Sequence, residues 1–186
     1  SGSKYSILSM TDSAIWNMKE NSSLGSLKML RGAHIDLSGA PEAQIGNILT
    51  VQGDLQGEGH FTFNARIADN VSDRVVVEGK ASGKYTLNIR NNGGETIQDS
   101  RMITLMSMKN PEQDFSKLSV TLTNGHVDIG TWRYRLTRDG YDYKLYNPIT
   151  GGEHNYSESV LGNTQKPTQS IQQANWISRE TNTVIS

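Results

Sequence analysis

The middle of the chain alternates apolar and polar side chains in short runs separated by glycine and asparagine. Residues 48–51, 60–65, 75–77 and 85–89 form such runs. Alternation with a period of two, bounded by turn-forming residues, indicates β-strands. Glycine and asparagine accept the positive φ that tight corners require. This part of the chain is therefore predicted to consist of many short strands and no helix.

The apolar runs recur at a loose interval along the chain. They begin at Leu27, Ile48, Val75 and Ile103, and are thus 21, 27 and 28 residues apart. Repeats of about 20–50 residues are typical of solenoids and propellers. Units that hold two or three short strands and no helix favour an all-β fold, a right-handed parallel β-helix with few rungs, where a rung is one turn of the chain. A β-sandwich, with strands about every 8–12 residues, stays open as the alternative.

A β-hairpin is the most strongly specified local structure. Residues 132–136 and 141–146 are predicted to be its arms, and Arg138-Asp139-Gly140 its turn, because Asp-Gly is a hairpin signature. Each arm places aromatic residues and leucine on one face and charged residues on the other. Such cross-strand pairs stabilise a hairpin by a few tenths to about 1 kcal/mol each.

The sequence divides into three predicted segments. Residues 1–117 are expected to form the β-helix rungs, and residues 118–148 the capping strands and hairpin. Residues 149–186 are expected to form a polar linker followed by a helix from about residue 170, which would be only marginally stable by itself.

Composition narrows the range of functions. The chain has 186 residues, a net charge of −1 and no cysteine. A balanced charge argues against nucleic acid as a partner, and the absence of cysteine excludes disulfides and thiolate metal sites. The low content of large apolar residues favours a narrow core, which repeat folds provide. The sequence shows neither an apolar run long enough to span a bilayer nor an amino-terminal signal pattern.

No catalytic motif emerges from the sequence, so we expect no enzymatic activity and no cofactor or metal. The four histidines are far apart along the chain, and acidic residues such as Asp69 and Asp73 lie at turns, where they usually bond to the local backbone. Gly79 to Tyr85 has the wrong spacing for a P-loop and is predicted to be a tight corner. The basic residues of the hairpin are expected to form a solvated face.

Three stretches of sequence resemble pertactin-like autotransporter passengers. Residues 120–136 (VTLTNGHVDIGTWRYRL) and 143–148 (YKLYNP) are similar to the carboxyl-terminal end of such passengers, and residues 59–94 to their last rungs. Residues 176–183 (WISRETNT) resemble the segment that enters the translocator barrel. Tyr143 departs from the tryptophan that the family often has at this position. The chain thus resembles the autochaperone or junction region, with a preference for a parent of the IcsA or AIDA type.

The resemblance implies export to the cell surface of a Gram-negative bacterium by type V secretion. This region would nucleate folding of the passenger during outer-membrane translocation. Its partners would be its own upstream rungs and its own translocator barrel, with periplasmic chaperones or a host protein as further options. The chain is then expected to be an excised part of a longer protein, with residues 1–3 partly a cloning remnant.

The residues expected to build the cap fall into two groups. Trp132, Tyr134, Leu136, Tyr143 and Leu145 are expected to supply its buried face, with Trp132 as a core side chain. Corners and turns are assigned to Gly125, Asp128, Gly130 and Gly140, with Asp128 bonding within its turn.

Two other functions stay open. One is a binding module, either an adhesin or a surface that docks the host actin machinery. The other is a β-helix enzyme that cleaves glycans, which would need two acidic groups about 5–10 Å apart across a groove.

Overall fold

The computed structural model describes residues 6–39, 45–91 and 102–149. The strands are β1 (Ile7–Met10), β2 (Ile15–Asn17), β3 (Ser22–Leu24), β4 (Ser26–Asp36), β5 (Ile48–Val51), β6 (Leu55–Arg66), β7 (Val71–Ser72), β8 (Arg74–Val77), β9 (Gly83–Asn91), β10 (Ile103–Met108), β11 (Leu118–Leu122), β12 (Val127–Ile129), β13 (Trp132–Asp139) and β14 (Asp142–Tyr146). Short 3-10 turns are η1 (Leu37–Gly39), η3 (Ile67–Asp69), η4 (Phe115–Lys117) and η5 (Thr123–Gly125).

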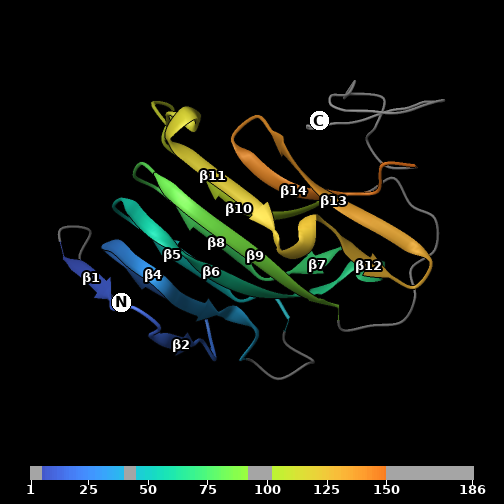
Figure 1. Ribbon diagram of the computed structural model, residues 1–186, viewed down its shortest axis with the longest axis horizontal. Coiled ribbons are helices and arrows are strands. Elements are labelled where there is room, and N and C mark those ends of the chain that lie inside the picture. The colour runs from blue at the N-terminus through green and yellow to red at the C-terminus, as the bar shows by residue number, and fades with distance from the viewer. Residues whose placement is uncertain (1–5, 40–44, 92–101, 150–186) are drawn as a thin grey trace.

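The strands form two sheets, and in the view of Figure 1 the sheet with β4, β6, β9 and β11 lies in front of the sheet with β5, β8 and β10. One sheet has the order β1-β4-β6-β9-β11, and the other has the order β12-β13-β14-β10-β8-β5-β3. From β3 to β10 in the second sheet, and from β1 to β11 in the first, neighbouring strands are parallel. The chain passes from one sheet to the other and returns one strand further along. This arrangement confirms the predicted parallel β-helix over the β-sandwich.

The core consists of side chains stacked in register between rungs. Ile35, Phe61 and Leu87 are aligned on β4, β6 and β9, and all three are fully buried. Val51, Val77 and Met108 form a second stack on the other sheet. Each stack needs only one apolar residue per rung, because the neighbouring rungs cover its two sides. A chain with few large apolar residues can therefore still exclude water from its centre.

The repeat predicted from the apolar runs mixes the two sheets. Ile48, Val75 and Ile103 begin or lie in strands of one sheet, whereas Leu27 belongs to β4 of the other. β3 precedes β5 in the same sheet, and its Ser22 pairs with Leu49, so the counterpart of Ile48 in the preceding rung is the residue just before β3. This strand begins with two serines and therefore does not stand out as an apolar run. The anomalous spacing of 21 residues therefore reflects a crossover between sheets and not a shorter rung.

The segment that begins at Gly79 contains the predicted corner between two strands, β8 and β9, and this corner is also a close approach between rungs. Gly83 has a φ of +111°, and a Cβ at this position would collide with the carbonyl oxygen of Gly57 in the rung below. Gly79 donates its N–H to the carbonyl of Gly53 at 3.0 Å. Only glycine fits a left-handed conformation at this separation. The two glycines that make this segment look like a P-loop in sequence are therefore required by the close stacking of rungs.

In the carboxyl-terminal part of the fold, the pairing of strands changes from parallel to antiparallel. β11, which the sequence places in the capping segment, is parallel to β9 and continues the first sheet. The antiparallel strands of the cap begin at β12, whereas the only earlier antiparallel pair in the described residues is the short contact of β7 with β6. Among the residues that the structure describes, no helix is long and apolar enough to cross a membrane. The predicted linker and helix of residues 150–186, and residues 1–3, lie outside the described part of the chain.

Candidate functional site

The predicted hairpin consists of β13 and β14, paired antiparallel from Arg135 opposite Tyr146 to Asp139 opposite Asp142. The two residues at the tip are Gly140 and Tyr141, so the turn lies one residue later than predicted from Arg138-Asp139-Gly140. Gly140 has a φ of +65° whereas Tyr141 has a negative φ, which is the pattern of a type II′ turn. Gly140 therefore has the corner role expected of it.

A second, shorter antiparallel pair precedes the hairpin. β12 pairs with β13, placing Val127 opposite Tyr134 and Ile129 opposite Trp132. Gly125 and Gly130 have φ values of +80° and +60°, as expected of corner residues. The sheet at this end is thus three consecutive antiparallel strands.

Asp128 bonds to a side chain and not to its own turn. Its two carboxylate oxygens accept hydrogen bonds from Nε and an Nη of Arg133 at 2.8 and 3.1 Å. These bonds hold the pKa of the Asp128 carboxyl below its usual range. The prediction of a bond within the turn is wrong, because the short β12–β13 connection places Arg133 directly opposite Asp128.

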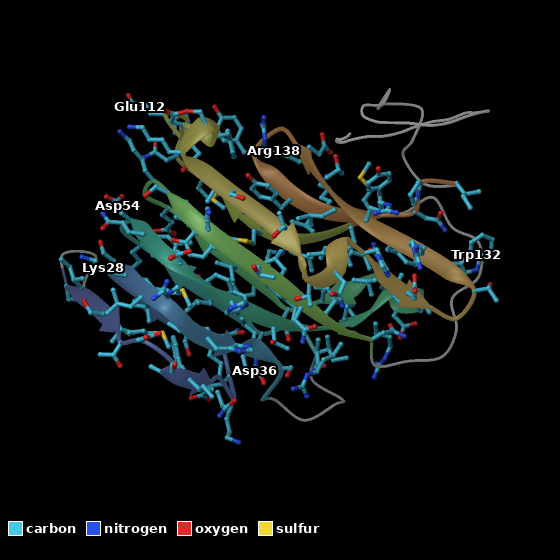
Figure 2. The ribbon with its side chains drawn as sticks, viewed as in Figure 1. Lys28, Asp36, Asp54, Glu112, Trp132 and Arg138 are labelled. Carbon is cyan, nitrogen blue, oxygen red and sulfur yellow. The ribbon has the colours of Figure 1, made fainter. Side chains whose placement is uncertain are left out.

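The buried face of the cap is narrower than predicted. Tyr134, Tyr143 and Leu145 are buried, with Leu145 only 1% exposed, and burial raises the pKa of Tyr143 to about 12. Leu136 and Trp132 are only partly buried. Trp132 is not a core side chain, because it lies at the first residue of β13, at one extremity of the molecule (Figure 2).

The hairpin closes the edge of the parallel sheet. β14 pairs antiparallel with β10, the last parallel strand of the second sheet, and Leu145 lies opposite Ile103. The register shifts between Thr104 and Met106. A parallel strand of a further rung cannot pair with β10 on this side, because β14 occupies its backbone groups.

Three aromatic rings and a guanidinium group fasten the hairpin to the loop before β11. The ring of Phe115 is edge-on to Tyr141 at 5.6 Å and tilted against Tyr143 at 6.3 Å between centroids. The guanidinium carbon of Arg138 lies 4.1 Å from the centre of the Phe115 ring. Sequence analysis missed Phe115, because nothing in the spacing along the chain connects it to residues more than 20 positions away.

The basic residues of the hairpin are engaged within the molecule. Arg133 binds Asp128, Arg138 covers Phe115, and Lys144 forms an ion pair with Asp139 at 2.9 Å. Arg135 donates to the carbonyl of Gly125 at 3.3 Å. The expected solvated face is exposed, but its cations already have partners.

Rung stacking brings together histidines that are distant in sequence. His34 and His60 are register partners on β4 and β6, with ring centroids 5.9 Å apart. Nε2 of His34 lies 2.7 Å from the hydroxyl of Thr62, and desolvation lowers the pKa of His34, an effect that the neighbouring Asp36 opposes. No group of three histidine, aspartate or glutamate side chains in residues 6–39, 45–91 and 102–149 could hold a metal ion.

Asp73 is a buried carboxylate whose oxygens bind backbone N–H groups. It is 1% exposed and accepts hydrogen bonds from the backbone N–H groups of Gly46, Asn47 and Asn64 at 3.1, 2.9 and 2.7 Å. Burial raises the pKa of its carboxyl, against the opposite effect of the three donors. The backbone groups that Asp73 binds are therefore not those of its own turn: they belong to the two residues before β5 and to Asn64 of β6.

Comparisons with known proteins agree with this architecture. Residues 24–147 match the family model described as Pertactin. The chain is 34% identical over 152 residues to the "IgA-specific serine endopeptidase autotransporter" of Neisseria gonorrhoeae, covering 81% of this chain and 10% of that protein. It is 33% identical over 129 residues to the "Pertactin autotransporter" of Bordetella parapertussis, covering 69% of this chain and 14% of that protein.

A solved structure shows the same fold. The crystal structure of the Haemophilus influenzae Hap adhesin matches with a TM-score of 0.69 and 32% identity, over 79% of this chain and 15% of that one. The chain therefore spans a small part of each relative. The predicted resemblance to pertactin-like passengers is confirmed, while the preference for an IcsA or AIDA type stays a prediction. This chain belongs to the pertactin family, and its fold is that of an autotransporter passenger β-helix.

Proposed function

We propose that this chain is the carboxyl-terminal autochaperone region of an autotransporter passenger, which folds first and then templates the rungs that precede it. The passenger would be exported through the outer membrane and displayed at the cell surface. The observation that carries the proposal is the antiparallel docking of β14 on β10, which closes one end of the parallel ladder.

The closed end is suited to early folding. The contacts of β13 with β14 join residues that are close in sequence, so the loop-closure entropy lost in forming them is small. A rung, by contrast, pairs residues about 26 positions apart, as His34 with His60. A hairpin that forms first would give β10 a strand to pair with, β14, before any other rung has formed.

The opposite end of the molecule is open. β1 and β3 are the terminal strands of their sheets in the described part of the chain. Ile7 and Ile15 near this end are 69% and 67% exposed, and Leu30 is 43% exposed. Backbone groups at such an edge require partners. The proposed partners are the upstream rungs of the same passenger, and its own translocator barrel would lie beyond the other end.

The proposal predicts that buried leucines at the two ends affect folding differently. Leu145→Ala in the hairpin should slow refolding in proportion to the stability lost, whereas Leu49→Ala in β5 should mainly accelerate unfolding. Both side chains are at most 1% exposed, and each truncation should cost about 2–5 kcal/mol. Stopped-flow refolding in urea measures both rates.

Equal effects of the two substitutions on the refolding rate would remove the basis for the proposal. In the full-length precursor, Leu145→Ala should reduce the amount of protease-resistant passenger at the cell surface. Normal display with normal protease resistance would contradict an autochaperone role.

The alternative functions have less support. A binding module that uses the basic hairpin is disfavoured, because Arg133, Arg138 and Lys144 already have partners within the molecule. Relatives include proteins named adhesins and proteases, but this chain corresponds to 7% to 14% of their lengths. For glycan cleavage, Asp73 is unsuitable as an acid facing a groove, because it is buried and bonded to backbone.

A further inference from the structure

One corner of the β-helix repeats the same backbone hydrogen bond from rung to rung. The N–H of Leu27 donates to the carbonyl of Asp54 at 2.8 Å, and the N–H of Leu55 donates to the carbonyl of Lys80 at 3.1 Å. Each donor residue has a register partner in the next rung: Leu55 for Leu27, and Ala81 for Leu55. The carbonyl that accepts the bond belongs to the residue immediately before that partner. Leu55 is in turn bridged to Ala81. The next donor in this series is therefore the N–H of Ala81.

At Ala81 a side chain replaces the backbone of the next rung. The N–H of Ala81 donates to Oε1 of Gln113 at 2.7 Å, and Nε2 of Gln113 donates to the carbonyl of Ala81, also at 2.7 Å. One rung earlier, the carbonyl of Leu55 accepts the N–H of Ser82 at 2.9 Å. The carboxamide of Gln113 thus supplies both the acceptor and the donor that two successive peptide groups, Lys80–Ala81 and Ala81–Ser82, supply to Leu55 in the rung before.

The length of the last corner explains why a side chain is needed. Seven positions separate Val51 from Glu58, and seven separate their register partners Val77 and Lys84. Eleven separate the next partners, Met108 and Ser119. The four additional residues carry the backbone away from the ladder. Gln113, at 8% exposure, reaches back into the vacated position.

The hairpin holds the loop that carries Gln113. The hydroxyl of Tyr141 donates to the carbonyl of Pro111 at 2.8 Å, and Arg138 lies over the ring of Phe115. These contacts flank Gln113 on both sides in sequence. Glu112, beside it, lies at the end of the molecule opposite Trp132 (Figure 2). The tip of the hairpin therefore positions the loop, and the loop presents the carboxamide to Ala81.

We propose that Gln113 is the residue that ends the solenoid ladder at this corner, where its side-chain amide substitutes for the acceptor and the donor that two successive peptide groups of a further rung would supply. A strand edge left open at Ala81 would expose an unpaired donor and acceptor to another chain. Gln113 closes that edge within the molecule. The hairpin thus completes the last rung through this loop. Only the consequence for folding of the passenger rests on the proposed function.

Amide hydrogen exchange of the full 186-residue chain, followed by NMR, tests the assignment. Gln113→Leu introduces an apolar side chain of similar size and removes both hydrogen bonds to Ala81, so the protection factor of the Ala81 amide should fall by about ten-fold or more. The Leu55 amide, whose acceptor is the carbonyl of Lys80, should stay protected. Glu112→Gln removes the exposed ion pair between Oε1 of Glu112 and Nζ of Lys80 at 3.7 Å and leaves Gln113 in place. It is the matched control and should leave both amides unchanged, because exposed ion pairs contribute little to stability.

Gln113→Glu provides a second and independent measurement. A protonated carboxyl can accept from the Ala81 N–H and donate to its carbonyl, whereas a carboxylate can only accept. The protection factor of Ala81, corrected for intrinsic exchange, should therefore be close to the wild-type value near pH 4 and fall as the pH rises to 7. If Gln113→Leu does not fold, this pH profile decides alone.

Three results would overturn the inference: wild-type protection of Ala81 in a folded Gln113→Leu chain, an equal loss of protection at Leu55, or protection in Gln113→Glu that does not depend on pH. Each is an equilibrium measurement on the folded chain. The refolding and display experiments can therefore fail while this assignment holds, and the reverse is equally possible.

Discussion

Single polar side chains stabilise this fold by taking the place of backbone partners. Asp73 accepts three backbone N–H groups, from the residues before β5 and from β6. Gln113 bonds both polar groups of Ala81. In each case a buried backbone group at an irregular corner is satisfied without water, and an unsatisfied one would cost about 1–3 kcal/mol. These residues stabilise the fold at positions where the regular ladder ends.

Asp73→Asn should destabilise the chain by about 1–3 kcal/mol. An amide has one acceptor oxygen, so its NH2 group would face at least one of the three backbone donors that the carboxylate now satisfies. Urea denaturation measures the change. Asp69→Asn, at an exposed position on the neighbouring turn, is the control and should change stability by less than about 0.5 kcal/mol. A similar loss in both variants would contradict this account of Asp73.

At the scale of the element, the cap is a three-stranded antiparallel unit with an uneven buried face. Tyr134 and Leu145 are buried, whereas Trp132 is partly exposed at the start of β13. Buried side chains occur in both antiparallel pairs: Tyr134 lies opposite Val127 of β12, and Leu145 of β14 lies opposite Ile103 of β10. Ile129 of β12 is also buried, so the exposure of Trp132 is local to the start of β13.

Tyr134→Ala should cost more stability than Trp132→Ala, although tryptophan is the larger residue. The buried tyrosine should cost on the order of 3–5 kcal/mol. The half-buried tryptophan should cost about 1–2 kcal/mol, because only part of its surface is removed from water. Midpoints of urea unfolding for the two variants provide the comparison. The reverse order would mean that Trp132 has core contacts in solution.

At the scale of the whole molecule, the two ends of the solenoid differ. The carboxyl-terminal end is closed by β14 on β10 and by Gln113 at Ala81, and the amino-terminal end presents β1 and β3 as terminal strands. In a repeat architecture each rung contacts only its neighbours, so a rung with one neighbour is less stable than an inner rung.

Backbone protection should therefore be graded along the molecule. Amides of β8, β9 and β10 should exchange near the rate of global unfolding, whereas those of β1 and β3 should exchange faster through local opening. Hydrogen exchange with mass spectrometry of the 186-residue chain resolves these segments. Uniform protection from β1 to β10 would indicate a fully cooperative unit and would contradict an open amino-terminal end.

The sequence by itself determined the elements that local physics controls. Alternation with a period of two placed the strands, Asp-Gly and its flanking aromatics placed the hairpin, and sparse apolar content indicated a narrow stacked core. The exact tip of the hairpin shifted by one residue, since the strand register also contributes to the choice of turn.

Tertiary structure alone decided which distant residues meet. The pairing of His34 with His60, of Phe115 with Arg138 and of Gln113 with Ala81 depends on rung register. Register is set by the number of residues in every corner, and an extension of four residues at one corner converts a backbone ladder into a side-chain cap. The partial exposure of Trp132 has the same origin, because burial depends on what the assembled sheets cover and not on the apolar character of the residue.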